Sequence, residues 1–331
     1  MPRTEFISTG FYVPERVVTN EELASIMDTS DEWIRTRTGI TERRWAADGQ
    51  MTSDLAVEAS KVALDRAGLL PSDLDCIVLA TLSGDYFFPG GGVYLQRKLG
   101  ITDIPCLDVR NQCSGFIYGL SIADAWIRTG QYKRLLLVGA EVHSTGMDLT
   151  TKGRDLSVLF GDGAGAAILA PPSDSGRGVL STHIFADGRY AELLFCDLGG
   201  CAHTPRMSHE HLDAGLHFPV MHGKEVFKHA SSKMPDAVKL ALQANGLTTA
   251  DIKVLIPHQA NLRISEMVQR RLGLRDDQVY NNIQRYGNTT AGSIPIALHE
   301  CIQSGKISRG DLVMFAAFGS GFTWGSAAVR W

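Results

Sequence analysis

An internal repeat constrains the fold of this chain more than any other feature of its sequence. The segment ALDRAGLLPSDLDCIVL (63–79) aligns without gaps with ALQANGLTTADIKVLIP (241–257), and Ala, Leu, Gly, Leu and Asp fall on identical types. Further along, LFGDGAGAA (159–167) is echoed by AFGSGFTWG (317–325), where Phe-Gly-x-Gly recurs. Two matches in the same order favour duplication over chance similarity between two α/β units. We therefore predict two related halves, residues 1–175 and 176–331.

The repeated unit has the pattern of a helix followed by a strand. Residues 54–68 carry apolar side chains at helical spacing and end at Gly68, which is typical of a helix C-terminus. Turn residues and a predicted strand at 76–81 follow, and alternation of this kind indicates an α/β fold. A chain of 331 residues exceeds the roughly 250–300 residues of a single core, which also favours two lobes.

The composition is that of an ordinary globular protein, with 44% hydrophobic and 21% charged residues and a formal net charge of −4. This charge gives no sign of a nucleic-acid or membrane-surface partner. No apolar run approaches the roughly 20 residues of a membrane-spanning helix, and the first residues lack the apolar stretch of a signal peptide. We therefore expect a cytoplasmic protein.

One of the six cysteines has a setting that suggests chemistry. No C-x-x-C pair occurs, so neither a disulfide framework nor a zinc ribbon is predicted. Cys113 lies between a predicted strand at 106–109 and a predicted helix at 114–130. The free N–H groups of that helix start favour a thiolate and suit an oxyanion on an attached substrate. The other five cysteines are interpreted as small buried hydrophobic residues.

Two further polar residues stand where apolar segments meet turns. His258 ends the predicted strand VLIP, at the position that Ala80 occupies in the first copy of the repeat. Asn288 precedes two threonines in a Gly/Thr/Ser-rich turn that opens an apolar helix. Taken alone, each residue has a structural alternative, a satisfied histidine for His258 and a helix cap for Asn288.

Taken together, these motifs resemble one enzyme family. Three motifs occur in order along the chain: Cys in C-S-G-F, His in P-H-Q-A-N-L-R and Asn in G-N-T-T-A-G-S. Three further segments belong to the same pattern, namely DEWIRTRTGI (31–40), FGDGAGAA (160–167) and FGSGFTWGSA (318–327). The chain resembles β-ketoacyl-acyl carrier protein synthase III, a condensing enzyme of the thiolase superfamily, over nearly its whole length. The resemblance implies a thiolase-like duplicated α/β fold with five αβαβα layers, which agrees with the repeat.

The resemblance implies a Cys113–His258–Asn288 triad. Cys113 takes the acyl group of an acyl-CoA, which splits one difficult condensation into two steps. Malonyl-acyl carrier protein then loses CO₂, and the enolate attacks the acyl carbon to give 3-oxoacyl-acyl carrier protein. His258 and Asn288 donate hydrogen bonds to the enolate oxygen, while the N–H groups of Cys113 and Ser320 form the other oxyanion hole. Coenzyme A thioester enters as substrate, and no metal or redox cofactor is expected.

The resemblance also implies binding residues and partners. Trp33 and Arg154 match positions that sandwich the adenine of coenzyme A, and Arg37 matches one near its phosphates, where a guanidinium suits both roles. Gly223, Phe227, Asn261 and Phe318 match positions along the substrate tunnel. Phe88 matches a residue that reaches into the acyl pocket of the partner subunit in a homodimer. Lys228 and Arg263 are expected to anchor the acidic carrier protein, with solvated surface charges as the alternative.

Several residues depart from the common family pattern near the expected acyl pocket. Asn111-Gln112 replace small residues before the cysteine, Ser320 replaces a glycine, and Tyr286 stands where His is frequent. In DYFFPGGG (85–92), the glycines at 90–92 remove side-chain volume beside Phe88. We therefore expect a primer longer than acetyl, since each buried methylene contributes roughly 0.8 kcal/mol. The aromatic residues of the same run leave the opposite result open.

Other interpretations stay open at this point. Gly161–Gly165 matches no nucleotide-binding pattern and is interpreted as a close-packed turn. Five of the ten histidines fall within 203–222, where a mobile polar loop is favoured over a metal site. For function, the alternatives are a transferase of the same fold with an alcohol or amine acceptor, a chalcone-synthase-like polyketide synthase, and a non-catalytic acyl-CoA-binding protein. The acyl chain length and the pathway are not predicted.

Overall fold

Two mixed sheets form the framework of the structure, a computed structural model that describes residues 3–173 and 176–331. The first sheet has the strand order β1-β7-β6-β4-β5 and the second β11-β12-β13-β8. The strands of the first sheet are β1 (Glu5–Tyr12), β4 (Cys76–Ala80), β5 (Cys106–Val109), β6 (Leu135–Glu141) and β7 (Gly163–Ala170). Those of the second are β8 (Gly178–Ala186), β11 (Ile252–Pro257), β12 (Leu312–Gly319) and β13 (Thr323–Arg330). β4 runs parallel to β5 and β6, and β11 runs parallel to β12.

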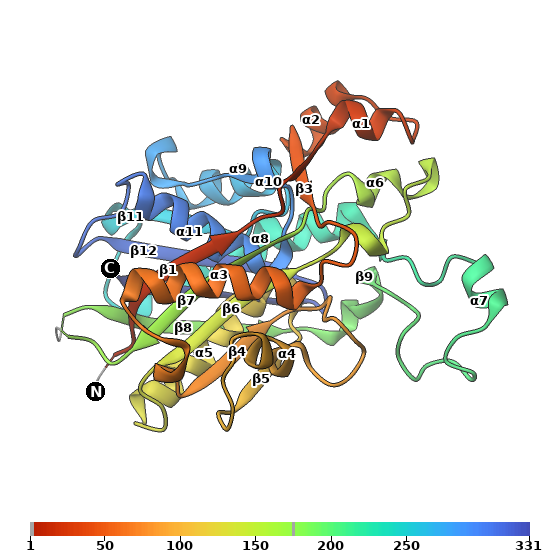
Figure 1. Cartoon of the computed structure of the whole chain (residues 1–331). Helices are drawn as coiled ribbons and strands as arrows, with labels where there is room; N and C mark the ends of the chain where they lie inside the picture. Colours follow the sequence, from red (N-terminus) through yellow and green to blue (C-terminus); the bar gives the residue numbers. More distant parts are fainter. Residues whose placement is uncertain (1–2, 174–175) are drawn as a thin grey trace.

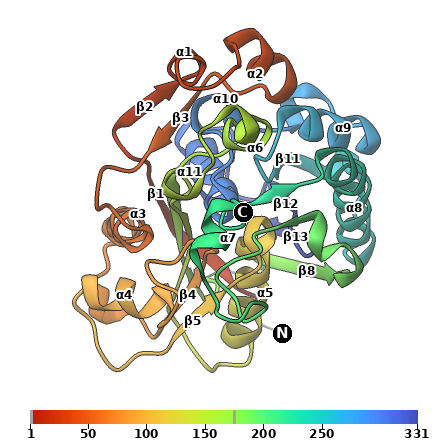
Figure 2. The same cartoon turned by 90° about the vertical axis from the view of Figure 1, so that its right-hand side faces the viewer.

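Helices cover both sheets and fill the space between them (Figures 1 and 2). The long helices are α3 (Thr52–Ala67), α4 (Gly91–Lys98), α5 (Gly115–Arg128), α8 (Gly223–Ala244), α9 (Leu262–Leu272) and α11 (Ser293–Gln303). One core packs α5 and α11 between the sheets, a second packs α3 and α4 on the outer face of the first sheet, and a third packs α8 and α9 on the second. The five αβαβα layers predicted from the sequence are therefore present.

The two copies of the sequence repeat have the same local structure. Gly68 ends α3 with φ 64°, and Gly246 follows α8 with φ 65°, a backbone conformation that strains residues with a Cβ. In the turn after each glycine, an aspartate caps the chain: Asp73 accepts from the N–H of Leu70 at 2.9 Å, and Asp251 from that of Thr248 at 2.7 Å. Residue 175, the expected end of the first half, lies outside the described residues, and the division into halves stays a prediction.

A smaller subdomain lies beside the sheets and contains β2 (Arg16–Thr19), α1 (Asn20–Ala24), α2 (Asp31–Thr38), β3 (Glu42–Trp45), α6 (Arg154–Ser157) and α10 (Ile283–Tyr286). A fully buried guanidinium joins several of its segments. Arg43 donates to the carbonyls of Val18 at 3.2 Å and Val158 at 3.1 Å, and to Oδ1 of Asn20 at 2.8 Å. These contacts join β3 to β2, to the start of α1 and to the residue after α6, which are segments of the subdomain far apart in the sequence.

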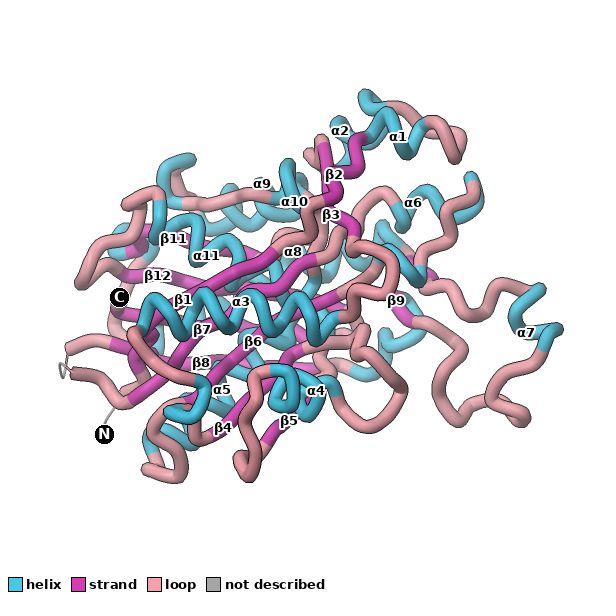
Figure 3. The backbone as a smooth tube through the Cα atoms, viewed as in Figure 1, coloured by secondary structure: helices cyan, strands magenta, loops and turns pink. Residues whose placement is uncertain are grey.

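The histidine-rich segment is an excursion, as predicted. It leaves the body after β9 (Leu194–Phe195), carries α7 (His209–Asp213), and returns at β10 (Val220–Met221), which pairs with β9. Between these strands the chain is mostly loop and projects away from the sheets (Figures 1 and 3). Among the described residues, no group of three or more His, Cys, Asp or Glu is placed to hold a metal ion. All six cysteines are free.

No helix in the described ranges is both long and apolar enough to cross a membrane.

Candidate active site

Cys113 lies where the sequence placed it, between β5 and the start of α5. It stands in a short 3₁₀ turn, Gln112–Ser114, that runs directly into the helix. The side chain is buried, and this burial, together with the nearby Glu141 carboxylate, raises the pKa of the thiol to about 12. The helix start is present, but burial outweighs it, so the expected resting thiolate is wrong. At neutral pH the Cys113 side chain is therefore a neutral thiol.

His258 follows β11 and is held as a neutral imidazole. The backbone N–H of His258 donates to the carbonyl of Ala316 at 2.8 Å. Burial lowers the pKa of the imidazole ring to about 3. Nδ1 lies 2.7 Å from Oγ of Ser293. That oxygen already accepts from the N–H of Gln259 at 3.3 Å, so its own hydroxyl hydrogen is free to donate to Nδ1. In this arrangement the ring proton is on Nε2, which is buried and has no hydrogen-bond partner among the described residues.

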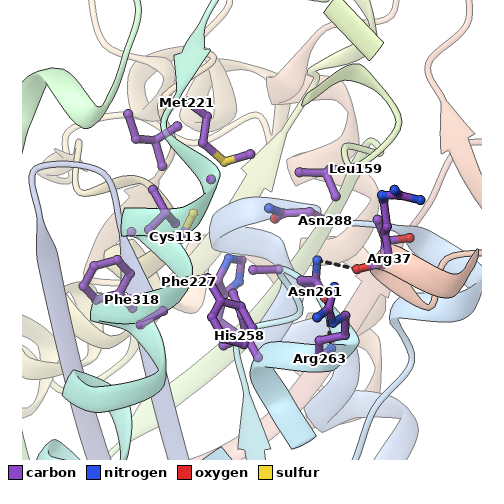
Figure 4. A pocket seen from close by; sticks show the side chains of 18 of the residues that line it. Arg37, Cys113, Leu159, Met221, Phe227, His258, Asn261, Arg263, Asn288 and Phe318 are labelled. Carbon is purple, nitrogen blue, oxygen red and sulfur yellow. Dashed lines mark hydrogen bonds between the residues drawn. The ribbon is translucent and has the colours of Figure 1, made fainter. Parts of the chain in front are cut away.

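Asn288 is clamped by its backbone and by one side-chain oxygen. Its N–H donates to the carbonyl of Leu159 at 2.8 Å, and its carbonyl accepts from Gly161 at 3.1 Å. Oδ1 accepts from the N–H of Thr290 at 2.9 Å, which leaves the amide N–H groups to face the cavity. Figure 4 shows the side chains of Cys113, His258 and Asn288 converging on the same pocket. The sequence-predicted triad is therefore brought together, and two of its members are neutral hydrogen-bond donors.

The triad lies in a cavity of about 630 Å³. Besides the three triad residues, seven predicted binding residues line it: Trp33, Arg37, Gly223, Phe227, Asn261, Arg263 and Phe318. Asn261 donates to the carbonyl of Arg37 at 3.0 Å, the bond drawn in Figure 4. This contact joins the subdomain that carries α2 to the start of α9.

Two guanidinium groups stack on the indole of Trp33. Those of Arg37 and Arg154 lie 4.4 and 5.0 Å from the ring centroid, which places the predicted adenine and phosphate residues in one cluster. Lys228 is not part of the cavity wall. Its side chain is 73% exposed and lies 3.5 Å from Glu225, so it is available to a partner at the surface.

A second cavity, of about 840 Å³, meets the first at Cys113. It is lined partly by polar groups, among them Gln112, His143, Thr290 and Ser320, and partly by apolar ones. Gln112, one of the two residues that replace small residues before the cysteine, thus contributes a polar side chain on this side of the sulfur. Phe87 lines the cavity, whereas Phe88 does not and is 77% exposed.

The glycines at 90–92 do not open this cavity, and the reason given for them from the sequence is wrong. None of the three lines it. A Cβ on Gly90 or Gly92 would lie 2.6 or 2.8 Å from the Asp108 carboxylate, and one on Gly91 would lie 2.8 Å from Leu79. That carboxylate accepts from the N–H groups of Gly91 and Gly92 at 2.5 and 2.8 Å. Glycine is needed there for the close approach of α4 to β5.

Ser320 lies beside Cys113 in the turn after β12. A Cβ on the preceding residue, Gly319, would lie 2.8 Å from that of Cys113, so the turn abuts the nucleophile. The hydroxyl of Ser320 donates to the carbonyl of Leu194 and is turned to that strand. Its backbone N–H is the group that the sequence assigned to an oxyanion hole with the N–H of Cys113.

Comparison with known proteins places the chain in a family. The family model for 3-oxoacyl-[acyl-carrier-protein] synthase III matches residues 107–188, and that for its C-terminal part matches residues 242–331. A β-ketoacyl-[acyl-carrier-protein] synthase III of Caldanaerobacter subterraneus subsp. tengcongensis is 47% identical over 325 residues, which cover 98% of this chain and 97% of that protein. The chain belongs to the 3-oxoacyl-[acyl-carrier-protein] synthase III family.

Other synthase III proteins agree with this assignment. The one from Acidiphilium cryptum is 46% identical over 331 residues and matches over 100% of both chains. The crystal structure of the one from Aquifex aeolicus VF5 has a TM-score of 0.91 at 41% identity, covering 99% of this chain and 100% of that chain. The predicted thiolase-like fold and the predicted enzyme class, a condensing acyltransferase, are confirmed.

Sequence reasoning missed the residues that hold the triad in place. Ser293 stands in the quoted motif G-N-T-T-A-G-S, but its contact with His258 depends on a turn whose shape the motif does not reveal. His143 was open to the argument used for His258, because it too follows an apolar strand. Thr290 gave no signal, since a second threonine in a polar turn is unremarkable in sequence.

Proposed function

We propose that Cys113, His258 and Asn288 carry out a decarboxylative Claisen condensation between an acyl-CoA and malonyl-acyl carrier protein. The observation that carries this proposal is the pair of neutral donors, the imidazole of His258 and the amide of Asn288, beside a buried thiol in one cavity. Two neutral donors suit an enolate oxygen, because a carboxylate there would repel the developing charge.

In the first half-reaction, the sulfur of Cys113 attacks the thioester carbonyl of acyl-CoA. The carbon–sulfur bond to coenzyme A breaks, and the proton of the thiol ends on the departing coenzyme A sulfur. The N–H groups of Cys113 and Ser320 stabilise the oxyanion formed on the way. The acyl chain then occupies the second cavity, since that cavity meets the first at the sulfur.

In the second half-reaction, malonyl-acyl carrier protein enters the vacated tunnel and loses CO₂. The electron pair of the broken bond forms an enolate, whose oxygen accepts from Nε2 of His258 and Nδ2 of Asn288. The enolate carbon attacks the acyl carbon on Cys113, and the released sulfur takes up a proton. The products are 3-oxoacyl-acyl carrier protein and CO₂, and the scheme requires no resident cofactor.

The binding assignments form part of the same proposal. Trp33, Arg37 and Arg154 hold the nucleotide of coenzyme A, since a cationic cluster around an indole suits an aromatic base with phosphates. Lys228 and Arg263 bind the acidic carrier protein near the mouth of the tunnel. The exposed Phe88 contacts a second copy of the chain in a homodimer. We place the reaction in the cytoplasm.

The test separates the two half-reactions. After incubation with acyl-CoA, intact-protein mass spectrometry should show one acyl group on Cys113, and Cys113→Ser should abolish both the adduct and condensation. Asn288→Ala and His258→Ala should still take the acyl group yet lose condensation by roughly 10²–10³. Cys196→Ser, which removes another thiol lining the second cavity, serves as the matched control and should behave as wild type. An adduct on Cys196 would refute the assignment.

A further inference from the structure

A buried hydrogen bond between side chains links the turn that carries Asn288 to the residue pair that follows β6. His143 follows β6, and its Nε2 lies 2.5 Å from Oγ1 of Thr290, two residues beyond Asn288. The two residues are 6% and 1% exposed. Both line the second cavity beside Cys113. None of the steps proposed above uses this pair.

Thr290 has a backbone conformation that is unfavourable for its type. Its φ is +49°, in the left-handed region that β-branched residues rarely occupy. In this conformation its N–H points at Oδ1 of Asn288, 2.9 Å away. Thr290 therefore bonds to the Asn288 amide through its backbone N–H and to His143 through its side chain.

His143 is well placed to hold Thr290 in this conformation, because it is itself anchored. The backbone N–H of His143 donates to Oδ1 of Asp162 at 2.7 Å, and the centroid of its ring lies 4.6 Å from that of the Phe160 ring. Asp162 accepts in addition from the N–H groups of Ser144 at 3.0 Å and Ala46 at 2.7 Å. The imidazole therefore has little freedom to follow Thr290 if that residue moves.

We propose that His143 and Thr290 are positioning residues that aim the amide N–H of Asn288 at the malonyl thioester. This inference rests on the role proposed for Asn288. His258 is oriented separately, through Ser293. Loss of the His143–Thr290 bond should therefore slow decarboxylation and condensation while leaving acylation of Cys113 intact.

The experiment compares Thr290→Val, which keeps the shape but removes the hydroxyl, with Thr290→Ser, which keeps the hydroxyl. Acylation by acyl-CoA is followed by mass spectrometry, and condensation by release of CO₂ from malonyl-acyl carrier protein. Thr290→Val and His143→Leu should each reduce the rate of condensation by about 10–100-fold, a smaller loss than removal of a whole oxyanion donor causes. The rate of acylation should stay within about twofold of the wild-type rate. Thr290→Ser should restore condensation. The double variant should be no slower than either single one, since both remove one bond.

A second buried His–Thr pair provides the control. Nδ1 of His299 lies 3.1 Å from Oγ1 of Thr9, and neither residue lines either cavity. Thr9→Val removes a comparable hydroxyl and should leave the ratio of condensation to acylation unchanged. This control shows what a general loss of stability does to the two rates.

The outcomes distinguish this inference from the proposed function. If Thr290→Val condenses at the wild-type rate while Asn288→Ala does not, the inference is wrong and the function stands. If Thr290→Val slows acylation and condensation equally, the pair is merely structural and the inference is again wrong. If Asn288→Ala itself condenses normally, the role of Asn288 fails, and the positioning role fails with it.

Discussion

Acidification is expected to destabilise the fold through its buried imidazoles, and His143→Gln should remove the share that His143 contributes. Burial lowers the pKa of both His143 and His258 from 6.5 to about 3. The unfolded chain therefore binds protons that the folded chain does not. Stability from these groups is fully present above pH 6.5 and is lost as the pH falls towards the folded-state value.

The size of the effect follows from the two pKa values. Between about pH 7.5 and about pH 5.5, each histidine should lower the free energy of unfolding by about 1.4 kcal/mol. Glu141 acts in the opposite direction, because burial raises its pKa from 4.5 to about 7 and the folded state gains its proton first. Over the same interval its protonation should stabilise the fold by about 2 kcal/mol. The wild-type change is therefore small, and only the comparison with a variant isolates the histidine.

The assay is urea denaturation at the two pH values, at one protein concentration, because association would make the apparent stability concentration-dependent. The loss of stability on acidification should be smaller in His143→Gln than in wild type by about 1.4 kcal/mol. His209→Gln, at an exposed position on α7, is the control and should match wild type. Equal losses in His143→Gln and wild type would show that His143 is not held neutral, and the reasoning would be refuted.

Three further predictions concern packing and binding. Gly139→Ala should lower the melting temperature strongly, because the new Cβ would lie 2.1 Å from a carbonyl oxygen in the 290–292 turn. In the control variant Gly188→Ala, the new Cβ would meet no atom within 4 Å, and the melting temperature should stay unchanged. Trp33→Ala should raise KM for acyl-CoA by about tenfold with little change in kcat, measured by steady-state kinetics; an unchanged KM would remove Trp33 from the site. Gly91→Ala should destabilise the protein without changing its preference among acyl-CoA chain lengths, and a changed preference would restore the interpretation that these glycines shape the acyl pocket.

Features set by local sequence could be predicted, and they include much of the fold. The strand at 106–109 is observed at those residues, and the helix predicted at 54–68 is α3, capped by Gly68. These elements follow from apolar spacing and from a glycine at a left-handed position, which are short-range properties. That Cys113, His258 and Asn288 share one site followed from the family resemblance of the motifs around them, and the three residues do line one cavity.

Features that depend on burial could not be predicted. The helix start next to Cys113 indicated a thiolate, yet desolvation raises the pKa of the thiol instead, and the degree of burial is a tertiary property. The run of glycines at 90–92 was interpreted as open space, although it is filled by Asp108 from a neighbouring strand. In both cases the deciding neighbour is brought in by the fold and lies outside the segment that was interpreted.

The turn from Asn288 to Ser293 is the structural reason to expect that the two proposed half-reactions can be separated. Its first residue supplies one donor, the N–H of Thr290 orients that donor, and Ser293 orients the imidazole of His258. The turn packs so closely on the first sheet that Gly139 has no room for a side chain. Cys113, by contrast, is carried by a different turn, at the start of α5. Under the proposed mechanism, a change within 288–293 should therefore act on the stabilisation of the enolate more than on the acylation of Cys113.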